Sequence, residues 1–260
     1  MVTGAASGIG RAFAERFAFL GVDLFVITRT EEDFYQLQNS LREINSTISI
    51  LGEWGDLANI DFVNSIKTSI ESPELNILSV VNNAGFGTSK IFSDDILEEE
   101  IDAIKVMTIA PLVFSHTLIS KASLDPNILK VSIINISSIS AFLPRGNYGA
   151  IKAWLNSFSY FLYSYQFDDL KIIVTWACPG LTRNTKFQEK AKLDTAKWPK
   201  IFWINPSLIV MKVLGKHESG GGQVIPGRIN LLIYLSSTKL VPIRLKKRLL
   251  GSKLLRAKRP

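Results

Sequence analysis

Tyr148 and Lys152 have the side-chain types and the spacing that acid–base chemistry requires. Residues at positions i and i+4 share one face of a helix, so the phenol and the ammonium would lie one above the other. A free phenol has a pKa near 10, and bringing it to about 7 takes roughly 4 kcal/mol of preference for the phenolate. An ammonium one turn away in a dry cleft can supply part of that preference. The pair therefore predicts a site of proton transfer.

A glycine-rich segment near the start of the chain has the spacing of an anion-binding turn. Gly4 would let the chain reverse, Gly8 would let backbone N–H groups approach an anion, and Gly10 would let a helix pack closely on a strand. The free N–H groups and the positive end of the helix dipole would face one point, where a diphosphate fits. A glycine turn that binds no ligand is the alternative interpretation.

The apolar pattern along the chain predicts strands that alternate with helices. We expect strands at 22–27, 48–54, 77–81, 129–136 and 172–176, and helices at 31–45, 95–122 and from 148 to about 165. This alternation predicts an α/β fold with a single Rossmann-type doubly wound parallel sheet flanked by helices. A ligand would then lie at the carboxyl ends of the strands.

The first strand is expected to be truncated, because only Met1 and Val2 precede the glycine turn. A central strand normally runs about five residues. We therefore hypothesise that the native N-terminus lies upstream. Residues 1–239 are expected to form one domain, followed by a basic C-terminal tail at 240–260.

The composition favours a cytoplasmic protein that does not bind nucleic acid. Ten Lys or Arg and no acidic residue lie in 219–260, so the net charge of +7 is local and the rest of the chain is slightly acidic. A solvated tail is the simplest interpretation, with a weak membrane-surface contact as the alternative. The single cysteine, Cys178, excludes an intrachain disulfide. No apolar run is expected to cross a bilayer.

Arg29 and Asp56 lie where two predicted strands end and bear on the choice of dinucleotide. A carboxylate beside the adenosine ribose would favour NAD, but that position holds Thr28 followed by Arg29, and a guanidinium suits the extra phosphate of NADP. Asp56 could accept from the adenine amino group or cap the following helix. Asn82 could face a cofactor or pin neighbouring strands through its amide.

These motifs occur in one order along the chain. They are the Thr3-Gly4 turn with Gly8 and Gly10, Asp56, Asn82-Asn83-Ala84-Gly85, Ser137-Ser138, Tyr148 with Lys152, and Pro179-Gly180. Together they resemble the short-chain dehydrogenase/reductase (SDR) family from residue 3 to about 190.

The resemblance implies an oxidoreductase that moves a hydride between a nicotinamide and a carbonyl carbon. It implies Tyr148 as acid/base, Lys152 as its activator and Ser138 as the partner of the substrate oxygen. It also implies NADP as the cofactor, with NAD as the alternative. The implied cofactor-binding residues are Gly4, Ser7, Gly8, Ile9, Gly10, Arg29, Asp56, Leu57, Asn83, Ala84, Gly85, Tyr148, Lys152, Pro179, Gly180 and Thr182, with Thr185 as an alternative hydroxyl.

Two departures from the family pattern suggest a second function. Met107 stands where many members carry an asparagine that holds a water behind the lysine, and a thioether cannot do so. The interval from Ser138 to Tyr148 is about three residues shorter than usual in the family, so Ser137 or Ser140 could replace Ser138. The alternative function is a catalytically impaired, SDR-like cofactor-binding protein that acts as a sensor or partner module.

The remaining residues bear on substrate and assembly. The segment 181–203 is rich in aromatic residues, which suits an apolar alcohol, ketone or 3-oxoacyl substrate, although an ordinary amphipathic helix explains it equally well. The helix after Tyr148 carries Trp154, Phe158, Phe161 and Tyr165, which we expect either in the core or at the interface of a homodimer or homotetramer. Cys178, His116 and His217 are expected to be structural or incidental, and no metal site is predicted.

Overall fold

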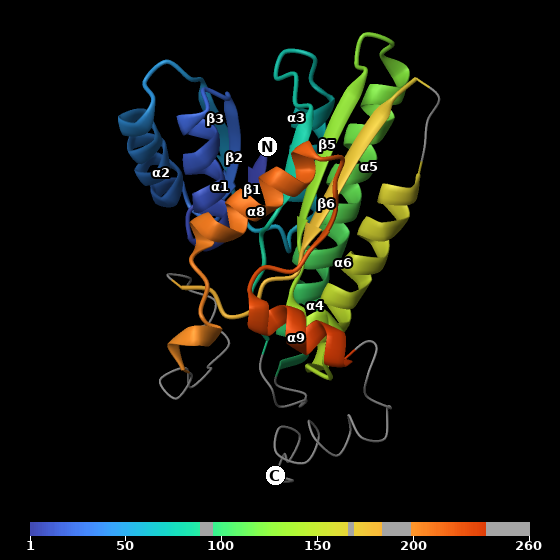
Figure 1. Ribbon diagram of the computed structural model, residues 1–260. Coiled ribbons are helices and arrows are strands. Elements are labelled where there is room, and N and C mark those ends of the chain that lie inside the picture. The colour runs from blue at the N-terminus through green and yellow to red at the C-terminus, as the bar shows by residue number, and fades with distance from the viewer. Residues whose placement is uncertain (89–95, 166–168, 184–198, 238–260) are drawn as a thin grey trace.

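A seven-stranded parallel sheet forms the centre of the computed structural model, which describes residues 1–88, 96–165, 169–183 and 199–237. The strand order is β3-β2-β1-β4-β5-β6-β7, and every neighbouring pair is parallel. The predicted Rossmann-type α/β fold is confirmed (Figure 1). The strands are β1 (Val2–Thr3), β2 (Leu24–Thr28), β3 (Ile50–Trp54), β4 (Ser79–Asn82), β5 (Lys130–Ile136), β6 (Lys171–Ala177) and β7 (Gly222–Val224).

The order of the strands reverses between β1 and β4, at the centre of the sheet. Strand β1 contains two residues, whereas β2 and β4 on either side of it contain five and four. Val2 is in register with Val26 of β2 and Val81 of β4. In doubly wound sheets a reversal of this kind opens a crevice at the carboxyl ends of the strands.

Helices cover both faces of the sheet (Figure 1). One face packs against α1, α2 and α8, and the other against α3, α5 and α6. The helix α9 contacts the 3₁₀ turns η3 and η4. The helical elements are α1 (Gly8–Phe19), α2 (Glu31–Ile44), α3 (Ile60–Glu71), α4 (Leu97–Ile104), η2 (Lys105–Ile109), α5 (Ala110–Leu124), η3 (Ile139–Phe142), α6 (Gly146–Ser164), η4 (Lys200–Phe202), α8 (Pro206–Glu218) and α9 (Arg228–Leu235).

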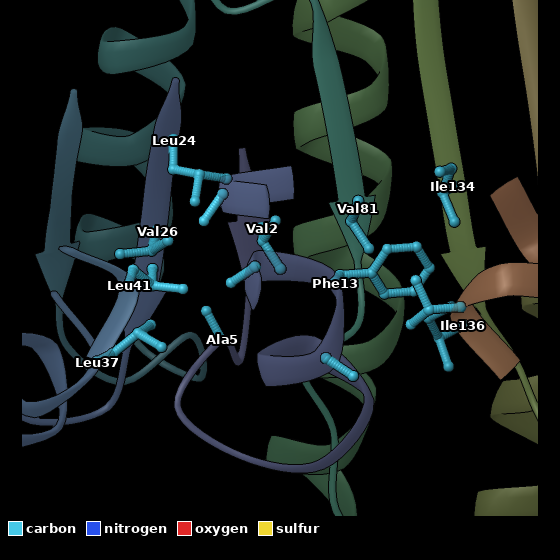
Figure 2. Close-up of a cluster of buried hydrophobic side chains, with 14 of the residues drawn as sticks. Val2, Ala5, Phe13, Leu24, Val26, Leu37, Leu41, Val81, Ile134 and Ile136 are labelled. Atoms are coloured by element: carbon cyan, nitrogen blue, oxygen red, sulfur yellow. The ribbon is translucent and has the colours of Figure 1, made fainter. Parts of the chain in front are cut away.

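The apolar faces of these elements form the core on each side of the sheet. Figure 2 shows one side, where the Phe13 ring of α1 reaches toward Val81 of β4 and Ile136 of β5. Leu37 and Leu41 of α2 lie one turn apart and pack on the same side of the sheet. Because the central strands carry apolar residues on both faces, they read as continuous apolar runs in the sequence.

Polar residues set where three helices begin. Thr30 accepts a hydrogen bond from the Asp33 N–H at the start of α2, and Asn59 accepts one from the Asp61 N–H at the start of α3. Asn205 caps α8 in the same way, immediately before Pro206. Each side chain satisfies an N–H group that the helix leaves without a partner. Asn59, and not Asp56, therefore caps α3.

The run from Leu97 to Leu124 joins α4, η2 and α5. It corrects the expectation that the chain contains no apolar run long enough to cross a bilayer. Its 28 residues are long and apolar enough to cross a bilayer by length and composition alone. Half of its most apolar stretch is buried, and Phe114 and Leu118 pack into the core of the domain. The π-helical turn η2 ends at Ile109, two residues before Pro111, which lacks the N–H that would continue the α-helical ladder.

A chain of buried amides crosses the middle of the sheet. The Asn82 amide donates to Asn135 Oδ1 at 2.8 Å, and the Asn135 amide donates to the Ser159 hydroxyl at 2.8 Å. The chain links β4, β5 and α6. The geometry therefore supports the interpretation that the Asn82 amide pins neighbouring strands. Since the amides have no access to water, each depends on its partner.

We expect Asn135→Ala to lower the free energy of unfolding by about 1–3 kcal/mol, because it removes the two buried hydrogen bonds that Asn135 makes with Asn82 and Ser159. Urea unfolding followed by circular dichroism measures this loss. Asn64→Ala, on the exposed face of α3, is the control and should change stability by less than about 0.5 kcal/mol. Equal effects of the two substitutions would contradict the proposed importance of the buried chain.

Candidate active site

A cavity of about 630 Å³ lies at the carboxyl ends of the strands. Its walls come from the segments that follow β1 to β6 and from α9. The volume is in the usual range for ligand-binding cavities. Every site residue predicted from the sequence within the described part of the chain lines this cavity, except Gly10.

The glycine turn is fixed to the end of β4 by hydrogen bonds. The Thr3 hydroxyl accepts from the N–H groups of Asn83 and Ala84, each at 3.0 Å, and the Asn83 amide donates to the carbonyls of Thr3 and Gly4. Gly10 packs directly beneath this contact, where a Cβ atom would overlap the Gly4 carbonyl oxygen and the Asn83 amide. Gly10 therefore supports the cavity wall without lining it.

The start of α1 faces the cavity with Ser7, Gly8 and Ile9. Within the described residues, no side chain caps this helix. Its first N–H groups are therefore available to an anion, and the helix dipole favours negative charge there. These features fit the diphosphate of a dinucleotide.

Ser138, Tyr148 and Lys152 meet at the end of β5. The Tyr148 hydroxyl is hydrogen-bonded to Ser138, and the Lys152 ammonium lies 5.8 Å from the centre of the Tyr148 ring. The ammonium donates to the Ile136 carbonyl at 2.8 Å, and the Ser137 hydroxyl donates to the Lys152 carbonyl at 2.9 Å. These two bonds fix the first turns of α6 against β5, which positions the phenol.

Burial shifts the pKa values of Tyr148 and Lys152. It raises the pKa of Tyr148 to about 12, and the hydrogen bond from Ser138 opposes only part of that rise. Burial also lowers the pKa of Lys152 to about 8. The shift of the phenol is opposite to the one expected from Lys152 alone, because loss of hydration outweighs the neighbouring ammonium. In the protein without cofactor the phenol therefore keeps its proton at neutral pH.

The short interval before Tyr148 is accommodated by a tight turn. After Ser138 the chain forms η3 and then enters α6 at Gly146, only two residues before Tyr148. The turn packs against Gly149, where a Cβ atom would lie 3.0 Å from the Ser140 carbonyl oxygen and 3.1 Å from that of Leu143. The absence of a side chain at Gly149 lets the shortened loop bring Ser138 to the phenol.

The structure also distinguishes the three serines. Ser137 is committed to the backbone of α6 through its bond to the Lys152 carbonyl. Ser140 lines the cavity, and its N–H donates to the Ser138 hydroxyl at 3.1 Å. Ser138 is the one whose hydroxyl is bonded to the phenol. The geometry therefore favours Ser138 over Ser137 and Ser140 as the partner of the substrate oxygen.

Met107 reaches the cavity behind the lysine. A Cβ atom on Gly85 would lie 2.8 Å from the Met107 sulfur and 3.7 Å from the Lys152 ammonium, so the thioether and the ammonium border the same small space. Met107 is 1% exposed and lies in the π-helical turn η2. A thioether is only a weak acceptor and does not replace an amide there.

The opposite end of the cavity carries Arg29, Asp33 and Asp56. The Arg29 guanidinium pairs with Asp56 at 2.7 Å, with both side chains largely exposed. The other oxygen of Asp56 accepts from the Ala58 N–H. The arginine that was expected to favour NADP is therefore already paired with one carboxylate. Asp33, which also lines the cavity, was not identified from the sequence.

Asn230 and Arg145 also line the cavity but were not predicted from the sequence as site residues. Asn230 is 4% exposed on α9, and its amide lies against Gly180 and donates to the Pro226 carbonyl at 2.7 Å. Residues on an element this far along the chain carry no local motif that reveals their position. Of the expected aromatic segment, Leu181 and Phe202 reach the cavity, whereas Thr185, Phe187, Leu193 and Trp198 lie outside the described residues, as does the tail 240–260.

Several other residues differ from the expectation or refine it. Phe161 and Tyr165 are exposed, so the interpretation of them as core residues is wrong for this chain alone. Cys178 is buried and its thiol donates to Asn156 Oδ1, and burial raises the pKa of the thiol to about 12. His217 is hydrogen-bonded to Thr175 at 2.9 Å, which gives it a structural role.

The sequence model for short chain dehydrogenases matches residues 1–196. The chain belongs to the short-chain dehydrogenase/reductase family. The prediction of the family and of its enzyme class, the NAD(P)-dependent dehydrogenases and reductases, is confirmed.

Two curated relatives share part of their length with this SDR chain. The chain is 31% identical over 207 residues to the very-long-chain 3-oxoacyl-CoA reductase of Mus musculus, covering 75% of this chain and 62% of that protein. It is 30% identical over 189 residues to the hydroxysteroid dehydrogenase-like protein 1 of Gallus gallus, covering 69% and 54%. The chain therefore spans less than two thirds of the length of either relative.

A solved short-chain dehydrogenase from Sphingobium yanoikuyae, in complex with NADPH, has the same fold. The two structures align with a TM-score of 0.80 at 23% identity, over 100% of this chain and 96% of the other.

The depressed pKa of Lys152 gives a pH-dependent prediction for this SDR protein. Between about pH 8 and 10.5 the folded protein binds fewer protons at this lysine than the unfolded chain does, so stability rises with pH across that window. Relative to Lys152→Met, wild type should gain up to about 3 kcal/mol of unfolding free energy there. Thermal unfolding at several pH values measures the difference. The control Lys212→Met, at an exposed lysine, should show no such trend, and a flat difference for Lys152→Met would refute the shift.

Proposed function

We propose that the protein is an NADP-preferring oxidoreductase that interconverts a secondary alcohol and a ketone, or a 3-oxoacyl group, on an apolar substrate. The observation that carries this proposal is the contact of the Tyr148 hydroxyl with Ser138, beside Lys152, in the cavity that also contains the glycine turn. A nicotinamide cofactor bound there would supply or accept the hydride.

The three side chains can perform the proton transfer. In the reductive direction the Ser138 hydroxyl donates a hydrogen bond to the carbonyl oxygen, and the Tyr148 phenol gives its proton to that oxygen as the alcohol forms. The raised pKa of Tyr148 keeps the phenol in the form that reduction requires. Lys152 then stabilises the phenolate through its positive charge. Oxidation follows the same steps in reverse.

The lining of the cavity supports an apolar substrate. Near Tyr148 it is formed mainly by side chains without charge, namely Val106, Met107, Ile139, Leu143, Leu181, Phe202 and Ile233. The names of the two curated relatives refer to a very-long-chain 3-oxoacyl-CoA reductase and a hydroxysteroid dehydrogenase-like protein. Both names agree with a large apolar body on the substrate.

The position of Met107 favours one second candidate, a cofactor-binding protein with impaired turnover that acts as a sensor or partner module. The thioether occupies the space beside Lys152 where a water relay would need a strong hydrogen-bonding group. The two candidates share cofactor binding and differ in proton transfer.

Reduction of bulky ketones and oxidation of bulky secondary alcohols should depend on the phenol of Tyr148. We expect Tyr148→Phe to lower kcat by at least about 100-fold, in line with the loss of a general acid, while NADPH still quenches or shifts protein fluorescence. Ser138→Ala should lower kcat less, because the phenol remains. NADPH binding without any turnover that depends on Tyr148 would favour the second candidate.

NADPH preference should depend on Arg29. Arg29→Ala is expected to weaken NADPH binding about tenfold, since a charge-assisted bond to the phosphate is lost, and to leave NADH binding nearly unchanged. Fluorescence titrations with both dinucleotides measure the ratio. Arg42→Ala, on the exposed surface of α2, is the control. If the ratio is the same in wild type and Arg29→Ala, the Arg29–Asp56 pair is only structural.

A further inference from the structure

Arg145 is a cation in the apolar part of the cavity. It lies three residues before Tyr148, at the position that caps α6, and lines the cavity with Ser140, Leu143 and Tyr148. Its Cβ lies 3.1 Å from the place of a Cβ on Gly149, so the packing of the short loop fixes the base of the side chain. The short loop thus places Arg145 on the wall of the cavity that contains Tyr148.

The described residues give the Arg145 guanidinium no ion pair or side-chain hydrogen bond. The two acidic residues of the cavity, Asp33 and Asp56, lie at the far end with Arg29, and Asp56 already pairs with that arginine. Glu100 contacts the first turn of α6, where its carboxylate accepts from the Asn147 amide at 2.7 Å. Glu100 does not line the cavity.

A guanidinium in this environment is poorly hydrated. Arg145 is partly buried, and the loss of hydration lowers its pKa. Its charge remains, because an arginine stays protonated in proteins. An oxyanion that accepts two parallel N–H bonds would replace the missing water, and such bonds strengthen when they are shielded from solvent.

We propose that Arg145 binds an oxyanion of the substrate, so that the substrate is an amphipathic ketone or alcohol with a carboxylate or phosphate on an apolar body. This inference rests on the proposed function, since it places the substrate in the same cavity. Arg145 acts as a specificity-determining residue and takes no part in the proton transfer by Tyr148.

The oxyanion has two chemical sources. One is the carboxylate of an oxo acid, and the other is a phosphate on a thioester carrier such as coenzyme A. A guanidinium fork fits both. The two are distinguished by pairs of compounds in which the anionic group is removed: a long-chain oxo acid against its methyl ester, and an acyl-coenzyme A against the pantetheine thioester of the same acyl chain, which lacks the phosphorylated nucleotide.

Calorimetric binding in the presence of NADPH tests the inference without requiring turnover. We expect wild type to bind the anionic member of at least one pair about tenfold or more tightly than its neutral partner, as a charge-assisted bidentate contact implies. In Arg145→Met this preference should disappear, and in Arg145→Lys it should be reduced, because an ammonium lacks the planar fork. Arg228→Met is the matched control, since Arg228 is exposed on α9 and does not line the cavity; it should keep the preference.

The outcomes separate this inference from the proposed function. Equal affinity for both members of each pair, or a preference that survives Arg145→Met in a variant with a wild-type melting temperature, overturns the role of Arg145. Tyr148-dependent turnover of the neutral compounds would then still support the oxidoreductase. An anion preference that depends on Arg145 without any turnover would retain the binding site and remove the enzymatic proposal.

Discussion

The site depends on the contact between the turn after β1 and the end of β4. Asn83 donates two hydrogen bonds to Thr3 across the point where the strand order reverses, and Gly10 lets α1 approach closely enough to lie beneath them. If this contact were lost, the N-terminus of α1 would no longer face the cavity. The geometry of the anion-binding end is therefore a consequence of packing between small residues.

A second set of buried contacts fixes the position of Tyr148 at the catalytic end of the cavity. The amide chain from Asn82 to Ser159 ties α6 to the centre of the sheet, and Lys152 and Ser137 join the start of α6 to the end of β5. Because these partners are buried, their bonds are not exchanged with water. The phenol of Tyr148 is consequently held by the sheet as well as by its own helix.

Charge is distributed unevenly along the cavity. Both acidic side chains lie with Arg29 at one end, whereas Lys152 and Arg145 lie at the other end among apolar groups. Desolvation lowers the pKa of both cations and raises that of Tyr148. This environment favours the neutral phenol and leaves the cations poorly hydrated. It therefore suits a substrate that brings a polar oxygen into a site without water.

The sequence by itself determined the order of the first six strands, the family, and the cavity residues of the glycine turn, the strand ends and the Tyr148–Lys152 pair, because these motifs act through local geometry. Tertiary structure alone decided which serine meets the phenol, how Gly149 accommodates the short loop, and that Arg145 and Asn230 reach the cavity. It also decided the direction of the Tyr148 pKa shift, since burial depends on elements distant in the sequence. Local patterns specify which groups are present, and only packing determines which of them lose water and meet.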